Sequence, residues 1–153
     1  MKSFWWKLLH GLLPTQDRVH RILRDRSPSP LCKLCQDAVV EDLKHAFFSC
    51  SHNNNAGAHL LTYMSSYVPG LSTNQLLHLN LDLEPSEEFS VVWFLGIGYF
   101  LLNLWTARTD KKQIRLYAIR ADLEARASLL SETRFQNEAV LVKEMIEICF
   151  ENV

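Results

Sequence analysis

Apolar side chains recur every three or four residues along most of the chain, which predicts helices rather than strands. The first predicted helix covers residues 3–12, and Gly11 and Pro14 mark its end. Its apolar positions are Trp5, Leu8, Leu9 and Leu12. A second helix is expected to begin after Thr15, which is a suitable N-cap, and to end before the Ser-Pro-Ser-Pro run at 27–30. The apolar stripe of this second helix is Val19, Ile22 and Leu23.

The same periodicity continues through the rest of the chain. Helices are predicted over 53–68, over a short segment capped by Ser72, from 86–88 onward, over 110–130 with Asp110 as cap, and over 135–150. The expected inward positions are Leu60, Leu61, Met64 and Tyr67 on the helix over 53–68, and Leu76 and Leu77 on the short helix after Ser72. On the helix over 110–130 they are Leu116, Ile119, Leu123, Ala127 and Leu130. On the last helix they are Ala139, Val142, Met145, Ile146 and Cys149. The expected fold class is therefore all-α, a helical bundle.

Residues 89–107 form a segment of 19 residues without a charge. A stretch of about 20 apolar residues is long enough to cross a bilayer, so a membrane span must be weighed. Ser90, Asn103 and Thr106 lie within it, however, and amphipathic helices on both sides need a partner to pack against. We therefore predict the central helix of the bundle and no membrane. Gly96 and Gly98 would permit close contact between helices.

The strongest chemical signal is the spacing C-x2-C-x9-H-x4-C formed by Cys32, Cys35, His45 and Cys50. Three of the four cysteines of the chain fall in this stretch, which gives no even set for disulfides. Four soft ligands predict a tetrahedral zinc site, and four protein ligands make the zinc structural rather than catalytic. His52 lies two residues from Cys50, which makes simultaneous ligation awkward, so it is left out of the ligand set.

Charge is segregated although the formal net charge is only −1. Residues 1–35 contain seven Lys or Arg against two Asp or Glu, whereas residues 36–88 contain one against seven. A basic N-terminal part suits contact with phosphate, although a basic helix face can also be simply solvated. The candidate phosphate-binding residues are Lys7, Arg18, Arg21, Arg24 and Lys33.

The segments FWWKLLHGLLPTQDRVHRIL, SPLCKLC and EDLKHAFFSC together resemble the zinc-binding domain that follows the polymerase in reverse transcriptases of LINE-type (non-LTR) retrotransposons. The resemblance covers residues 4–50. The matching positions are Phe4, Trp6, Lys7, Leu8, His10, Gly11, Leu13, Pro14, Thr15, Cys32, Leu34, Cys35, Glu41, His45 and Cys50. It implies zinc binding and a role beside the polymerase in handling template RNA or target DNA.

Catalytic motifs are missing from the sequence: there is no phosphate-binding glycine loop, no HExxH and no serine triad arrangement. We therefore expect no enzymatic activity from this chain alone. Two function classes remain, a zinc-stabilised nucleic-acid-binding module and a zinc-stabilised helical module that docks on a protein such as a polymerase. The expected division is a zinc module over 1–52 and a helical bundle over 53–153, packed as one unit. Zinc-bound thiols and an N-terminus without a cleavage site predict an intracellular protein, nuclear or cytoplasmic.

Overall fold

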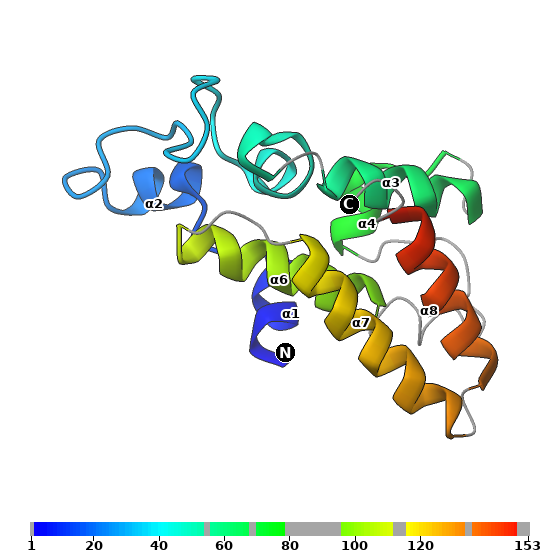
Figure 1. Cartoon of the computed structure of the whole chain (residues 1–153). Coiled ribbons are helices and arrows are strands. Elements are labelled where there is room, and N and C mark those ends of the chain that lie inside the picture. The colour runs from blue at the N-terminus through cyan, green and yellow to red at the C-terminus, as the bar shows by residue number, and fades with distance from the viewer. Residues whose placement is uncertain are drawn as a thin grey trace.

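The computed structural model describes residues 2–53, 56–67, 70–78, 96–111, 116–133 and 136–149 (Figure 1). Helices dominate these ranges, and no β-strand occurs within them, so the all-α prediction is confirmed for the part described. The helices are α1 (Lys2–Leu9), α2 (Gln16–Ile22), α3 (Ala56–Tyr67), α4 (Thr73–His78), α6 (Gly98–Thr109), α7 (Leu116–Ser131) and α8 (Gln136–Cys149). Two short turns, η1 (His45–Ser49) and η2 (Ser51–Asn53), lie between α2 and α3.

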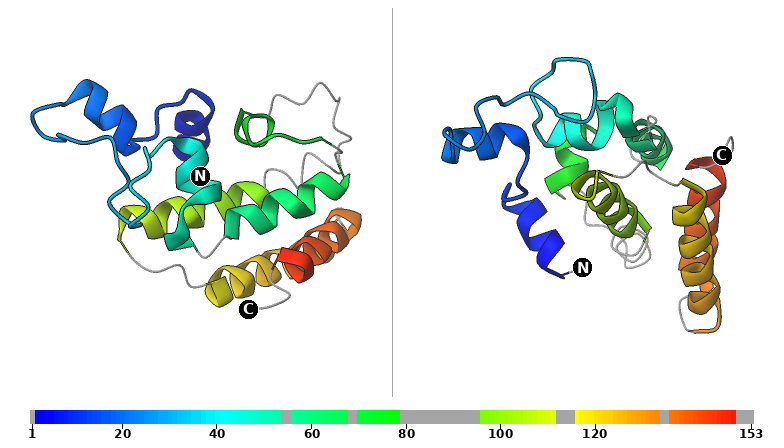
Figure 2. Two further views of the ribbon diagram at one scale, coloured as in Figure 1. Left: turned by 90° about the horizontal axis from the view of Figure 1, so that it is seen from above. Right: turned by 60° about the vertical axis from the view of Figure 1, so that its left-hand side comes forward.

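Helix α6 lies between the N-terminal helix and the C-terminal helix pair. In Figure 2, right, it is seen between α1 on one side and the pair α7 and α8 on the other. Helices α7 and α8 run antiparallel, α8 contacts α3, and η1 contacts both α3 and α6 (Figure 1). One cluster of buried side chains includes Phe4 and Phe47 together with Leu104 and Met145. The N-terminal region and the later helices therefore share a core.

Two glycines let helices approach α6 closely, as the sequence predicted. A Cβ atom added to Gly98 would lie 2.2 Å from Cζ2 of Trp5, which would displace the indole. A Cβ atom on Gly96 would lie 3.0 Å from Cε of Met145 on α8. These positions bring α1 and α8 against the N-terminal end of α6, where side chains would otherwise separate them.

The predicted buried stripes of the last two helices are confirmed where they are described. Ile119, Leu123 and Ala127 are buried on α7, and Leu130 is half-buried. On α8 the buried set is Ala139, Val142, Met145 and Ile146. The side chains of Tyr67, Leu116 and Cys149 lie outside the described part. Buried aliphatic residues at helical spacing thus fix which sides of α7 and α8 face inward.

Both predicted N-caps of the short helices are confirmed. The Thr15 hydroxyl accepts a hydrogen bond from the Arg18 backbone N–H at 3.4 Å, at the start of α2. The Ser72 hydroxyl accepts one from the Gln75 N–H at 3.2 Å, and the Gln75 side chain accepts one from the Ser72 N–H at 2.9 Å. Each cap satisfies backbone donors that the first helical turn leaves without a partner.

Three expectations are corrected by the structure. The first helix ends at Leu9 rather than Leu12, because Gly11 adopts a positive φ of 60° and turns the chain. The stripe on α2 does not reach the core, since Ile22 and Leu23 are exposed. Asp110 lies at the C-terminal end of α6 instead of capping the next helix, and the next described helix begins at Leu116.

The segment weighed as a membrane span is only partly described, because residues 79–95 lie outside the described ranges. Within those ranges, no helix has the length and hydropathy needed to cross a bilayer. The part that is described, α6, buries Phe100, Leu101, Leu104 and Trp105 against the other helices. A core role for this part of the segment is therefore confirmed.

Candidate metal centre

The first two cysteines lie on a tight loop closed by a short backbone bridge. Leu31 and Val40 pair in an isolated antiparallel bridge, and the Cys32 N–H donates to the Val39 carbonyl at 2.9 Å. Inside the loop the Leu34 N–H points at Sγ of Cys32, 3.4 Å away. This contact fixes the position of the Cys32 sulfur inside the loop.

The second pair comes from the turn that follows. The Asp42 side chain accepts a hydrogen bond from the His45 N–H at 2.7 Å, so Asp42 caps the turn. The Cys50 N–H donates to the His45 carbonyl at 3.0 Å, which closes a wide turn of π-helical form. The acidic pair Glu41 and Asp42 is typical of the first turn of a short helix that would end at His45; instead His45 begins η1, and Cys50 directly follows it. The wider turn brings residues five apart in sequence to the same side.

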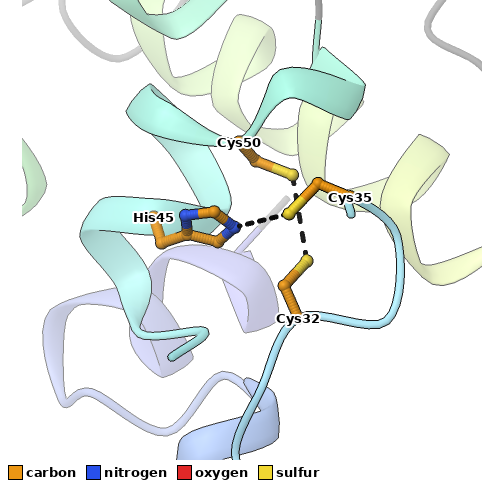
Figure 3. A group of neighbouring side chains, drawn as sticks. All are labelled: Cys32, Cys35, His45 and Cys50. Atoms are coloured by element: carbon orange, nitrogen blue, oxygen red, sulfur yellow. Dashed lines mark hydrogen bonds between the residues drawn. The ribbon is translucent and has the colours of Figure 1, made fainter. Parts of the chain in front are cut away.

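The four side chains converge on one point (Figure 3). Their ligand atoms all lie within 4.8 Å of one another. Sγ of Cys32 and Sγ of Cys50 are 3.9 Å apart, and Sγ of Cys35 is 3.3 Å from Nε2 of His45. Tetrahedral zinc with Zn–S bonds of about 2.3 Å places neighbouring sulfurs about 3.8 Å apart. The arrangement therefore fits a zinc ion in size and in donor type.

The surroundings of the cluster match those of a closed metal site. Nδ1 of His45 lies 3.4 Å from the Ser49 hydroxyl, leaving Nε2 directed at the cluster. A hydrogen bond on the second ring nitrogen fixes the orientation of a ligating histidine. His52 does not belong to the cluster of potential ligands, in agreement with its exclusion on sequence grounds.

Burial controls the protonation of the Cys50 thiol. Removal from water, with Cys32 and Cys35 close by, raises the pKa of the Cys50 thiol to about 12. The Ser51 hydroxyl donates to Asp37 at 2.9 Å and lowers the pKa of that carboxyl, and this bond joins the cysteine loop to η2. A metal ion would have to displace the Cys50 proton, because only the thiolate is a strong zinc ligand.

Aromatic residues pack the centre onto the helical body. Phe47 and Phe48, inside η1, are both buried. The ring of Phe47 lies 6.5 Å from that of Phe4 on α1 and 5.9 Å from that of Trp105 on α6. Gly57 on α3 is in direct contact with η1, since a Cβ there would lie 1.8 Å from the Phe47 carbonyl oxygen. Three helices thus hold the turn that carries His45 and precedes Cys50.

A buried ion pair, which sequence reasoning missed, ties the module to α6. Glu41 lies outside any helix, and its carboxylate is completely buried and contacts the Arg108 guanidinium. The same carboxylate accepts a hydrogen bond from the Gln16 N–H at 2.8 Å. Arg108 also lies over the Trp105 ring, 4.8 Å from its centre. Burial lowers the pKa of Arg108, and its attraction to Cys32 opposes that shift.

The five candidate phosphate-binding residues do not form one continuous face. Lys7, Arg24 and Lys33 are exposed, on α1, on the turn after α2 and on the cysteine loop respectively. Arg18 donates to the Gly11 carbonyl at 2.9 Å, and Arg21 forms an ion pair with Asp17 at 2.7 Å. Two of the five cations, Arg18 and Arg21, therefore have partners within the chain. Contact with phosphate stays a prediction for all five.

Comparison with known proteins supports the metal chemistry. Residues 1–56 match the family model described as zinc-binding in reverse transcriptase, which is somewhat more than a third of the chain. No curated protein and no solved structure matches the chain. The matched segment contains all four side chains of the cluster. Fold and site thus define a mostly helical chain whose N-terminal segment resembles a zinc-binding module associated with reverse transcriptases, a module rather than a catalytic domain.

Proposed function

We propose that Cys32, Cys35, His45 and Cys50 hold one structural zinc ion. The observation that carries this proposal is the coincidence of two independent results: the four ligand atoms converge, and the matched family is a zinc-binding one. Four protein ligands leave no open position for water or substrate, so the zinc would order the chain rather than react. Its binding free energy would stabilise the fold of the N-terminal region.

We further propose that the chain is an accessory module of a LINE-type reverse transcriptase, placed after the polymerase and contacting template RNA or target DNA. By itself the module has no enzymatic activity in this proposal. Support comes from the family match and from the seven basic residues within 1–35. Cations such as Lys7 and Lys33 would position nucleic acid through its phosphates without selecting its sequence.

The salt dependence of binding to single-stranded RNA tests the nucleic-acid role. Five phosphate contacts predict a slope of log affinity against log salt near −3.5, at about 0.7 for each contact on a single strand. The double variant Lys7→Gln, Lys33→Gln should reduce that slope by about 1.4. Lys143→Gln, which removes an exposed cation on α8, is the matched control and should leave the slope unchanged. Binding that is absent, or insensitive to salt, would contradict the proposal.

A second candidate function, docking on a protein partner, has one specific observation in its favour. Leu31, Val39 and Val40 are exposed on and beside the bridge that closes the cysteine loop. Exposed aliphatic side chains next to each other are typical of interaction surfaces. A complex with the polymerase domain that survives high salt and is lost in Val39→Ser would favour this function. Persistence of the complex in that variant would exclude this surface.

A further inference from the structure

Helix α1 has one side that faces solvent and carries a tryptophan, Trp6, which is unusual at an exposed position. Phe4, Trp5 and Leu8 are buried, whereas Ser3, Trp6, Lys7 and His10 are exposed. The exposed positions follow the spacing of a single helix face. Trp6 is 55% exposed although Trp5, next to it, is in the core. In Figure 2, right, α1 lies at the edge of the molecule, with α6 on only one side of it.

The exposed indole is held in a fixed orientation. The rings of Trp6 and His10 stack with centres 4.8 Å apart and an angle of 27° between their planes. Nδ1 of His10 lies 2.8 Å from the Trp6 carbonyl oxygen, so the imidazole is itself tied to the helix. The pair presents a preorganised aromatic surface, which loses little conformational entropy when a flat ligand stacks on it.

Two cations belong to the same region as this aromatic pair. Lys7 is exposed on the same helix face. Arg18 comes from α2, but its guanidinium donates to the Gly11 carbonyl at 2.9 Å and so lies at the turn that directly follows α1. A guanidinium has five N–H donors, and this bond occupies one of them. The surface thus combines one π surface with positive charge from two helices.

The residues on this exposed face of α1 favour a nucleic acid over a protein as its partner. Trp6 is the only large apolar side chain among these four exposed positions, three on α1 and His10 directly after it. A protein interface generally buries a contiguous apolar patch at its centre, which this face does not offer. A single aromatic beside cations is instead the arrangement on which an unpaired base stacks while its phosphates contact Lys or Arg.

Resting on the nucleic-acid function proposed above, we infer that Trp6 and His10 form a stacking platform for one unpaired base of a single-stranded nucleic acid. Lys7 and Arg18 contact the phosphates on either side of that base. Bases in a duplex have both faces covered by their neighbours, so the platform distinguishes single strands from duplexes. No particular base is selected, because every base offers a π surface.

The test compares a fluorescein-labelled 12-nucleotide oligo(U) strand with a labelled duplex of the same length, by anisotropy on the full chain with zinc present. Stacking of one base is worth about 1–3 kcal/mol, so Trp6→Ala should weaken single-strand binding by about 5- to 150-fold. Duplex affinity should change less than twofold. The salt slope should stay as in the wild type, because no cation is removed.

Two further variants separate stacking from other effects. Trp6→Leu keeps an apolar side chain but has no π surface, and should lose as much affinity as Trp6→Ala. Tyr117→Ala removes an aromatic residue of similar exposure, 62%, on α7 and should change nothing. Since Trp6 is exposed, its variants should retain the zinc content and circular dichroism of the wild type. If Trp6→Ala fails to fold, the comparison of Trp6→Leu with Trp6→Phe, which should keep most of the affinity, decides the question.

The outcomes distinguish this inference from the function on which it rests. Wild-type affinity for oligo(U) in Trp6→Ala and Trp6→Leu would overturn the platform and leave the salt-dependent module standing. A wild-type chain that binds neither strand nor duplex would overturn both. Variants that bind oligo(U) normally but lose a polymerase fragment would assign the Trp6 face to a protein partner.

Discussion

Replacing Arg108 with Met tests whether the N-terminal module and α6 fold as one unit. The Arg108 guanidinium contacts the Glu41 carboxylate. The Glu41 side chain is 0% exposed and the Arg108 side chain is only 10% exposed. Met has a similar reach and fills apolar space, so the main effect is an uncompensated buried charge on Glu41. Removing one partner of a buried pair costs about 3–5 kcal/mol. Loss of the contact with the Trp105 ring adds to this.

The assay is urea unfolding followed by circular dichroism, with saturating zinc and a reductant. Arg21→Met is the matched control, because its partner Asp17 belongs to the same helix and the two side chains are 67% and 28% exposed. Loss of that surface pair should cost under about 1 kcal/mol. If Arg108→Met loses no more stability than Arg21→Met, the ion pair does not couple the module to α6.

A double-mutant cycle with Glu41→Leu sharpens the test. Replacing both charges removes the buried unpaired carboxylate, so the double variant should be more stable than Arg108→Met alone. It should not regain wild-type stability, because the Gln16 N–H loses its acceptor on Glu41, which costs about 1 kcal/mol or more. Strictly additive losses would refute the reasoning, since they would mean that the two side chains do not interact energetically.

Three further predictions concern the backbone and the thiols around the centre. Gly57→Ala should lower the free energy of unfolding by about 1–3 kcal/mol or more, because its Cβ would collide with the Phe47 carbonyl oxygen. A melting temperature within a degree of wild type would contradict the packing of α3 on η1. Ala38 has a φ of 51°, so Ala38→Gly should be neutral or stabilising by up to about 1 kcal/mol. The control Ala125→Gly, at an exposed position on α7, should cost about 0.5–1 kcal/mol. Equal losses of stability for the two variants in chemical denaturation would argue against a strained turn at Ala38. The pKa of Cys50 is raised from 9.0 to about 12 in the folded chain, so metal-free protein should be most stable below pH 9 and lose stability as pH rises toward 12. Unfolding curves in reductant that do not change across this pH range would refute the burial of the Cys50 thiol.

Local patterns predicted most of the described helices, and they singled out the four side chains that the structure brings together. Residues such as Ile119, Leu123 and Ala127 follow the helical period because one side of α7 faces the core, and the caps at Thr15 and Ser72 depend only on neighbours within three residues. These features are encoded over short stretches of sequence, so periodicity and capping rules recover them.

Features that depend on distant residues were not recoverable. Glu41 and Arg108 are separated by 67 positions, and nothing near either one indicates that both are buried. Ile22 belongs to the apolar stripe predicted for the second helix, but α2 projects away from the core and leaves it exposed. A period shows that a helix has an apolar side, but tertiary packing decides whether that side is covered.

The central claim is that one zinc ion is held by Cys32, Cys35, His45 and Cys50. Metal analysis of the purified chain by mass spectrometry tests it directly. We predict one zinc for each wild-type chain, almost none in Cys50→Ser or His45→Ala, and one in His52→Ala, whose imidazole lies outside the cluster. A wild-type chain without zinc, or a His45→Ala variant that keeps its zinc while His52→Ala loses it, would contradict the claim.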